Sequence, residues 1–311
     1  METSSFTTNF TKLRYPFSET LLSKRENFPA WIKWYPSPSS TKNANGTLLG
    51  QAGFRTRKWS PFQVSCSRER DISVIEAGCM DDIYDSLAEH LVPTAAASSP
   101  NFKHIVGLAG PPGAGKSTIA SEIAKRVNKL WSQKSRSFDS QVEPPEVAIV
   151  LPMDGFHLYR HQLDAMEDPE EAHARRGAPW TFDPNLLLEC LKTLKDQGSV
   201  YCPSFDHGVG DPVEDDIFVN LQHKIVIVEG NYLLLGDGAW KELSSMFDEK
   251  WFIDVDIEKA MQRVLKRHIS TGKPPDAAKW RIDYNDRPNA ELIMKSKKNA
   301  DLVIKSIDEL R

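Results

Sequence analysis

Apolar and polar positions follow two different patterns along the chain after about residue 100. Short, predominantly apolar runs predict buried strands, which span 104–110, 147–153, 200–206, 224–230, 249–256 and 300–306. Between them, apolar residues recur at intervals of three and four, which predicts helices over 116–131, 182–198 and 257–271. Strands this apolar are typically covered on both faces, as in a parallel sheet. The alternation therefore predicts an α/β domain with a doubly wound, mostly parallel sheet and helices on both faces.

The beginning of the chain has a different composition. Up to residue 70 it holds four acidic residues against eleven Lys and Arg, and Ser and Thr are frequent. This composition is typical of an organelle transit peptide, and "FQVSCS" at 62–67 resembles a plastid processing site. We therefore expect a transit peptide over 1–67 and location in the chloroplast, with the mitochondrion or cytoplasm as alternatives. An unstructured tail would have the same composition.

The sequence pattern predicts secondary structure less clearly in the segment between this tail and the main domain. Residues 71–90 space apolar side chains at helical intervals, and "VPTAAASSPN" at 92–101 has the composition of a linker. We therefore expect an N-terminal helix and linker over 68–100 and the main domain over 101–311.

The composition of the whole chain argues against several kinds of protein. The chain has 311 residues, of which 40% are hydrophobic and 26% charged, as in a folded globular protein. No run approaches the roughly 18 unbroken apolar residues of a membrane helix. The formal net charge of −4 gives no sign of a nucleic-acid surface. Four widely separated cysteines suggest reduced thiols rather than a disulfide framework or a zinc site.

A phosphate-binding loop lies between the first predicted strand and the first helix of this domain. The sequence "GPPGAGKST" fits the P-loop pattern, and its residues are Gly110, Pro111, Pro112, Gly113, Ala114, Gly115, Lys116, Ser117 and Thr118. Glycines let successive backbone N–H groups turn toward phosphate oxygens, and the helix that follows adds its positive dipole end. Lys116 supplies a charge for the β- and γ-phosphates, and Ser117 a hydroxyl ligand for Mg²⁺. The loop therefore predicts binding of ATP with Mg²⁺.

Two acidic residues follow other predicted strands. Asp154 comes after 147–153, and Glu229 is near the end of 224–230. Because ligands bind beyond the carboxyl ends of parallel strands, both carboxylates are expected near the phosphate loop. We interpret Asp154 as the base that accepts the proton of an attacking hydroxyl, and Gly155 as leaving room for that hydroxyl. Glu229 is expected beside Ser117 at the metal. Helix capping by Asp154 and a solvent-exposed turn at Glu229 are the alternatives.

Several segments together resemble a known family. In order they are "GPPGAGKST", "DGF", "RRGAPWTFD", "PSFDH", "VIVEGNYLLL" and "FIDVD…QRVLKRH", and the resemblance covers about 100–305. They resemble the uridine kinase, pantothenate kinase and phosphoribulokinase family. The resemblance implies transfer of a phosphoryl group from ATP, with Mg²⁺, to a hydroxyl of a small molecule, with Asp154 at the position of the family's base. "DGF" and "RRGAPWTFD" are closer to pantothenate kinases, whereas "NDRPNAELI" is more like a uridine-kinase-like branch.

Further residues are candidates for binding the acceptor or the transferred group. His157 and Tyr159 follow the proposed base, and Arg176 is suited to an anionic or polyhydroxyl acceptor. Asp206 and His207 match the acceptor-binding segment that the resemblance implies. Arg263 and Arg267 lie four residues apart on one helix face and are expected to close over the γ-phosphate as part of a lid that begins at Gly272 and Pro274. Solvent exposure or helix-dipole pairing would account for the same arginines.

The sequence therefore predicts an ATP-dependent phosphotransferase acting on a hydroxyl of a small metabolite. A nucleoside, a sugar and a pantothenate-like acid all remain open as acceptors, with a nucleoside preferred. A GTPase would need an NKxD segment to bind its base, and the sequence has none. The strand that ends at Glu229 has a single acid, whereas a motor ATPase would have adjacent acids there. An ATP hydrolase and an ATP-binding regulatory protein without transfer activity are the alternatives. The partners expected are a small-molecule acceptor and neither nucleic acid nor membrane, and the oligomeric state stays open.

Overall fold

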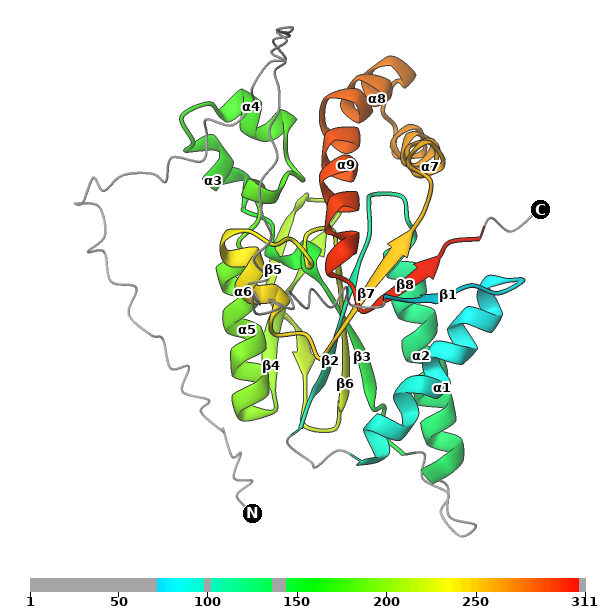
Figure 1. The fold of residues 1–311 in the computed structure, drawn as a ribbon. Helices are drawn as coiled ribbons and strands as arrows, with labels where there is room; N and C mark the ends of the chain where they lie inside the picture. The colour runs from blue at the N-terminus through cyan, green and yellow to red at the C-terminus, as the bar shows by residue number, and fades with distance from the viewer. Residues whose placement is uncertain (1–71, 98–101, 136–143, 308–311) are drawn as a thin grey trace, which may run out of the picture. The chain divides into compact units, whose positions relative to one another are not determined.

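The computed structural model describes residues 72–97, 102–135 and 144–307 (Figure 1). All of them belong to the compact unit Cys66–Arg311. The predicted transit peptide at 1–67 lies outside the described residues. None of the helices in these ranges combines the length and apolar character needed to cross a bilayer.

Six strands form one parallel sheet in the order β1-β8-β7-β2-β6-β3. Their bounds are Ser73–Ile75 (β1), His104–Ala109 (β2), Ala148–Pro152 (β3), Ile225–Gly230 (β6), Glu249–Asp254 (β7) and Leu302–Lys305 (β8). The other two strands, Val200–Asp206 (β4) and Asp211–Val219 (β5), pair antiparallel in a separate sheet. The predicted α/β class with a mostly parallel sheet is confirmed.

Helices connect and cover these strands. The α-helices are α1 (Met80–Ala97), α2 (Lys116–Ser135), α3 (Arg160–Asp164), α4 (Pro169–Ala174), α5 (Pro184–Gln197), α6 (Gly238–Ser244), α7 (Ile257–Ser270), α8 (Pro275–Arg281) and α9 (Arg287–Lys295). Shorter helical turns are η2 (Met153–Phe156), η3 (Pro179–Thr181), η4 (Ile282–Asp286) and η5 (Ser296–Asn299). Helix α5 is capped at both ends: Asp183 accepts hydrogen bonds from two backbone N–H groups, and Gly198 adopts a left-handed conformation.

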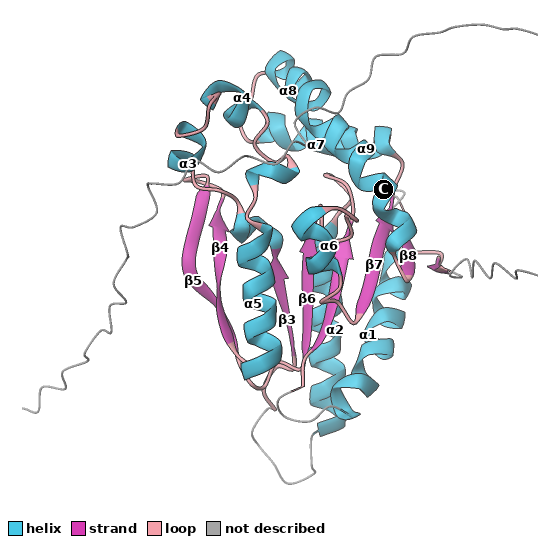
Figure 2. Ribbon diagram, turned by 60° about the vertical axis from the view of Figure 1, so that its left-hand side comes forward, coloured by secondary structure: helices cyan, strands magenta, loops and turns pink. Residues whose placement is uncertain are grey.

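Two hydrophobic cores lie on opposite faces of the parallel sheet. Successive residues of β6 point alternately to the two faces, so Ile225 and Ile227 join one core, whereas Val226 and Val228 join the other. Helices α1, α2 and α7 pack in the first core, and α5 and α6 in the second. Figure 2 shows the sheet between these helices, with α3, α4, α7 and α8 gathered beyond the carboxyl ends of the strands. The side chains of these helices therefore lie near the carboxyl edge of the sheet, which is where ligands bind in such folds.

The segment before β2 is part of this core rather than a helix followed by a linker. Residues 73–75 form β1, which pairs with β8 at the edge of the sheet (Figure 1). Helix α1 starts later than predicted and continues through Pro93 to Ala97, so residues 92–97 of the predicted linker are helical. Burial of Leu91, Val92 and Ala95 against the sheet outweighs the hydrogen bond that Pro93 removes on the exposed side.

The β4–β5 hairpin also differs from the prediction. Residues 200–206 do form a strand, but they pair with β5, which the sequence pattern did not indicate. Strand β5 exposes Val213, Glu214, Asp215 and Asp216 in succession, so it has no apolar run. An antiparallel hairpin open to solvent tolerates such a strand, whereas the parallel sheet buries its strands.

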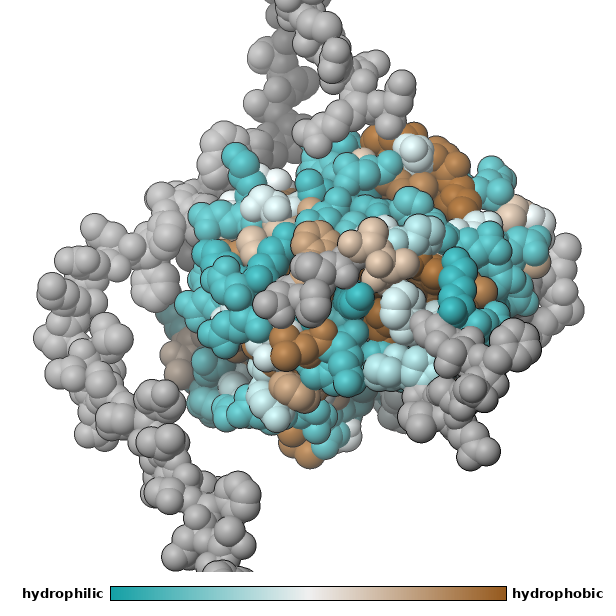
Figure 3. Space-filling view, turned by 90° about the horizontal axis from the view of Figure 1, so that it is seen from below, coloured by the Kyte–Doolittle hydropathy of each residue, from teal (hydrophilic) through white to brown (hydrophobic). Residues whose placement is uncertain are grey.

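The surface seen from the amino ends of the parallel strands is mainly hydrophilic. Figure 3 shows apolar residues there as separate patches rather than as one continuous area. Scattered exposed apolar side chains are normal for a folded domain, so this face gives no indication of a binding site.

Candidate active site

The predicted site residues gather at the carboxyl edge of the sheet because of the strand order. Strand β6 lies between β2, which leads into the phosphate loop, and β3, which leads into Asp154. The register pairs Glu229 of β6 with Leu108 on one side and with Pro152 on the other. Three adjacent parallel strands therefore deliver the loop, Glu229 and Asp154 to one edge, as ligand sites in such sheets require.

The phosphate loop has the backbone that its glycines predict. Gly113 and Gly115 have φ angles of 80° and 87°, in the left-handed region. A Cβ atom on Gly113 would lie 2.3 Å from the carbonyl oxygen of Ala260 in α7, so only glycine fits there. Arg263 of α7 donates a hydrogen bond from Nη1 to the carbonyl oxygen of Gly113 over 3.2 Å. Helix α7 thus packs directly on the loop.

Ser117 and Glu229 are in contact at the start of α2. The Ser117 hydroxyl donates a hydrogen bond of 2.7 Å to Glu229 Oε1. Burial raises the pKa of Glu229, although Lys116 and Ser117 act in the opposite direction. A hydroxyl beside a buried carboxylate suits Mg²⁺, which takes oxygen ligands and is usually held by one or two carboxylates together with substrate phosphates. No cluster of three or more metal-binding side chains occurs within the described ranges, so such a metal would depend on phosphate oxygens.

Lys116 is enclosed by the same groups. Its ammonium donates a 3.2 Å hydrogen bond to the carbonyl oxygen of Pro111. Burial lowers the pKa of Lys116, and Arg267 acts in the same direction, whereas Glu229 and Asp154 raise it. Phosphate oxygens would oppose the effect of burial and favour the charged ammonium. The loop is therefore arranged to gain from a polyanionic ligand.

Asp154 lies in η2, directly after β3. Its side chain lines a cavity, and its backbone oxygen accepts hydrogen bonds from His157 N (3.2 Å) and from Nδ1 of the same histidine (2.8 Å). The structure requires glycine at the neighbouring position 155 for a reason other than the predicted one. A Cβ atom there would lie 2.0 Å from the carbonyl oxygen of Pro203 in β4. The glycine permits close backbone approach of the hairpin, rather than leaving room for a hydroxyl.

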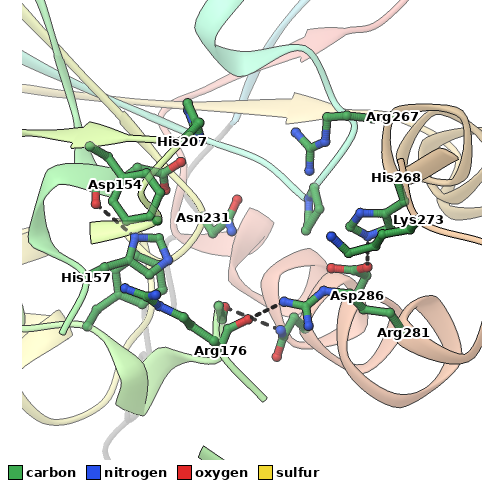
Figure 4. A pocket seen from close by; sticks show the side chains of 16 residues that line it. Asp154, His157, Arg176, His207, Asn231, Arg267, His268, Lys273, Arg281 and Asp286 are labelled. Atoms are coloured by element: carbon green, nitrogen blue, oxygen red, sulfur yellow. Dashed lines mark hydrogen bonds and ion pairs between the residues drawn. The ribbon is translucent and has the colours of Figure 1, made fainter. Parts of the chain in front are cut away.

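The cavity has a volume of about 350 Å³ (Figure 4). Its lining residues come from widely separated parts of the chain, between positions 112 and 289. They are Pro112, Asp154, His157, Arg176, Gly177, Phe182, Phe205, His207, Gly210, Asn231, Arg267, His268, Lys273, Arg281, Asp286 and Asn289. The phosphate loop contributes Pro112, β4 contributes Phe205, and the rest is drawn from the segments that follow β3, β4 and β6 and from the region of α7 to α9. Such a polar cavity beside a phosphate loop is suited to a small polar ligand.

Five of the predicted catalytic and acceptor-binding residues meet in this cavity. They are Asp154, His157, Arg176, His207 and Arg267. Their roles stay predictions, but the structure brings them together from four separate stretches of the chain.

Three other predicted residues have structural contacts outside the cavity lining. Tyr159 donates from its hydroxyl to Glu214 in β5 over 3.0 Å. Asp206 accepts hydrogen bonds from the backbone N–H groups of Gly208 and Val209, which closes the β4–β5 turn. Arg263 contacts the phosphate-loop backbone, so Arg267 is the member of the arginine pair that faces the cavity.

Sequence reasoning missed several lining residues. The set is Phe205, Asn231, His268, Lys273, Arg281 and Asp286. The cluster of basic residues near the end of α7 is a signal for His268 and Lys273. Arg281 had no such signal, because the mixture of charged and apolar residues over 275–284 is that of an ordinary surface helix. The predicted loop after Gly272 is instead helix α8, with Pro274 as its N-cap.

His157 forms an aromatic wall of the cavity. Its ring centroid lies 3.9 Å from that of Phe182 and 4.7 Å from that of Phe205. Burial lowers the pKa of His157, and Arg176 and His207 add to this effect, while Asp154 opposes it. Because the carbonyl oxygen of Asp154 only accepts, Nδ1 of His157 carries the hydrogen, and Nε2 of the neutral ring is left as an acceptor.

Comparisons with known proteins agree with this architecture. The model of the "Phosphoribulokinase / Uridine kinase family" matches residues 105–310. A Schizosaccharomyces pombe protein named "Putative uridine kinase C227.14" is 38% identical over 208 residues, which cover 65% of this chain and 83% of that protein. "ATP-dependent kinase YFH7" of Zygosaccharomyces rouxii is 33% identical over 195 residues, covering 51% of this chain and 52% of that protein.

Among solved structures, one similar protein is described as a "putative fructose transport system kinase from Silicibacter sp. TM1040". It has a TM-score of 0.60 and 29% sequence identity, over 71% of this chain and 98% of that chain. The likeness extends over nearly the whole of that structure, so the fold of the described domain is that of a P-loop kinase.

Proposed function

This chain belongs to the phosphoribulokinase/uridine kinase family of ATP-dependent P-loop kinases, and on that basis we propose that it transfers the γ-phosphoryl group of ATP to a hydroxyl of a small metabolite. The observation that carries the proposal is the cavity, which Pro112 of the phosphate loop and Asp154 line together. A hydroxyl bound beside Asp154 would lie next to the end of a nucleotide held by the loop. Water alone would not need the aromatic and basic walls of this cavity.

The proposed step forms one bond and breaks one. The acceptor oxygen forms a bond to the γ-phosphorus, and the bond from that phosphorus to the β,γ-bridging oxygen breaks. ADP leaves with the bridging oxygen, and the proton of the hydroxyl passes to Asp154. Most of the acceleration would come from positioning and from neutralising charge on the transferred group, to which Lys116 and Arg267 contribute.

A divalent cation fits the proposal at Ser117 and Glu229. Bound there, Mg²⁺ would neutralise charge on the phosphate oxygens. We expect Glu229→Gln to raise the Mg²⁺ concentration needed for half-maximal rate, since it removes the charge of the carboxylate. A titration of the initial rate with Mg²⁺ measures this, and an unchanged midpoint would remove Glu229 from the metal site.

An acceptor screen that measures ADP release tests the proposed function. The full chain is incubated with ATP, Mg²⁺ and single compounds from sets of nucleosides, sugars, hydroxy acids and sugar phosphates. ADP that depends on one acceptor supports the kinase. ADP at the same rate without acceptor indicates an ATP hydrolase, and tight ATP binding without ADP indicates a regulatory protein.

A further inference from the structure

The charged residues of the cavity are unevenly balanced. Four cations line it, Arg176, Arg267, Lys273 and Arg281, against the two carboxylates of Asp154 and Asp286. Asp286 already accepts a hydrogen bond of 2.8 Å from His268 Nε2. The cavity therefore has positive charge in excess of its own carboxylates, which favours an anionic ligand.

A nucleotide accounts for only part of this excess. Arg267 lies one helical turn after Arg263, which contacts the phosphate loop, and its charge acts to lower the pKa of Lys116, so it belongs to the phosphate-loop end. Figure 4 shows the Arg267 side chain well separated from Arg176. Arg281 reaches toward Arg176 and donates from Nη2 to its carbonyl oxygen over 3.0 Å. Arg281 thus lies beside the backbone of Arg176, and these two residues supply cations to the part of the cavity away from Arg267, which we call the second cationic group.

Arg176 is held in position but keeps unused donors. Its Nη2 donates to the carbonyl oxygen of Leu158 (2.9 Å) and to Asp211 Oδ1 (3.1 Å), and its guanidinium lies 5.7 Å from the ring centroid of Phe205. The buried Nε has no hydrogen-bond partner within the described part of the chain. A buried donor without an acceptor is costly, and an oxyanion is the ligand that a guanidinium binds best.

The backbone that carries Arg176 is fixed by side chains from η4, α9 and the segment after β6. Asn285 donates to the carbonyl oxygen of Arg176 over 3.0 Å, and Tyr232 and Asn289 donate to that of Gly177 over 2.5 and 3.4 Å. These contacts join the segment before η3 to the segment after β6 and to the region of η4 and α9. Such support would hold the guanidinium in one orientation before a ligand arrives, which reduces the entropy cost of binding.

Arg281 and Lys273 contribute charge that is not neutralised locally. Neither side chain forms an ion pair within the described residues, whereas Arg176 has Asp211. Lys273 is exposed at the turn between α7 and α8. The rings of His157 and Phe205 also line the cavity: His157 contacts the backbone of Asp154, and the guanidinium of Arg176 lies over the ring of Phe205. A small molecule with a hydroxyl at one end, an anionic group at the other and a short carbon body matches this order of chemistry.

We propose that the acceptor is a small hydroxylated anion, whose carboxylate or phosphate group is bound by Arg176, Arg281 and Lys273 while its hydroxyl lies at Asp154. The proposal rests on the proposed function and makes it more specific. It disfavours an uncharged nucleoside or free sugar, whose binding would leave the second cationic group without a partner.

Matched pairs of acceptors test the proposal. Each hydroxy acid is compared with its methyl ester, and each sugar phosphate with the free sugar, for binding to protein loaded with a non-hydrolysable ATP analogue and for ADP release with ATP. We expect the charged member of a pair to bind at least about 10-fold more tightly. The carboxylate and phosphate sets show which anion is recognised. Equal binding within every pair, or productive use of a neutral nucleoside, overturns the proposal.

Variants of α8 locate the anion. Arg281→Gln should raise the KM for the charged acceptor about 10- to 100-fold without changing the affinity for the ATP analogue. Arg281→Lys keeps the positive charge and should raise the KM for the charged acceptor by a smaller factor. Lys279→Gln removes an exposed charge from the same helix outside the cavity and serves as the matched control. If Arg281→Gln and Lys279→Gln have the same KM, the anion is not bound here.

The two proposals fail in distinguishable ways. Acceptor-dependent ADP release with neutral compounds only would keep the kinase and reject the anionic acceptor. Anion binding that depends on Arg281, without ADP release from any acceptor, would keep the binding site and reject phosphoryl transfer.

Discussion

The phosphate loop at the nucleotide end of the cavity consists of nine consecutive residues, 110–118, whereas the proposed acceptor end takes side chains from segments more than 130 residues apart. The nucleotide end uses backbone N–H groups, one lysine and a helix terminus, all of which are set by local sequence. The acceptor end depends on tertiary packing, because Arg176, His207 and Arg281 meet only after β3, β4 and α8 are assembled. The same contrast decides how far each end tolerates substitution.

The largest effect is expected from Lys116→Ala at the nucleotide end. Loss of the ammonium removes charge compensation for the phosphates, so kcat/KM for ATP should fall by about 10³-fold with every acceptor. Steady-state ADP release measures this. Lys125→Ala is the control, since Lys125 lies on the same helix but is exposed and paired with Glu122. A similar, small effect of both substitutions would contradict the assignment of the loop.

A selective effect on the acceptor end is expected from Gly155→Ala. The added Cβ would meet the Pro203 carbonyl at 2.0 Å, and relief of this overlap must move η2 against the hairpin. We expect a loss of about 1–3 kcal/mol in the free energy of unfolding and a higher KM for the acceptor, with KM for ATP unchanged.

Chemical denaturation and steady-state kinetics measure these two consequences of Gly155→Ala. Gly78→Ala is the control, because no atom lies within 4 Å of the Cβ it would add. An equal rise in both KM values would show that the two ends are not independent.

The smallest effect on activity is expected from a substitution of Glu249, at the amino ends of the parallel strands and away from the cavity. Glu249, the first residue of β7, accepts hydrogen bonds from His104, Trp251 and His90. Burial alone would raise the pKa of Glu249, but these hydrogen bonds outweigh it and lower the pKa to about 2. A depressed pKa stabilises the fold above the ordinary pKa of glutamate, and this stability is lost as pH falls through the folded-state pKa.

Glu249→Gln should therefore lower the free energy of unfolding at pH 7 by up to about 3 kcal/mol, with little effect on either KM. The difference between the two proteins should shrink as the pH is lowered from about 4.5 toward 2. Denaturation curves at pH 7 and pH 3 measure it. A difference that stays the same at both pH values would mean that the ionised carboxylate is not the source of the stability.

The sequence predicted best what depends on neighbouring residues. Strands β2, β3, β6, β7 and β8, helices α2, α5 and α7, and the backbone of the phosphate loop all follow from local pattern. It predicted least where packing decides: β1, the continuation of α1 through Pro93, the exposed strand β5 and the helices 275–295. For the same reason Asp154 was singled out by its position after a strand, whereas Arg281 was not.

The reason for Gly155 also lay outside the local sequence. The pattern "DGF" suggested space for an acceptor beside Asp154, but the constraint comes from the backbone of Pro203, nearly fifty residues later. A glycine next to a candidate catalytic residue therefore does not by itself indicate a substrate pocket.

Asp154→Asn tests the central claim most directly, because it removes the carboxylate charge and keeps the backbone oxygen that His157 contacts. With an acceptor identified by the screen, the account predicts that kcat falls by about 10²-fold or more while the affinity for ATP is unchanged. Near-normal transfer to the acceptor by this variant would contradict the account.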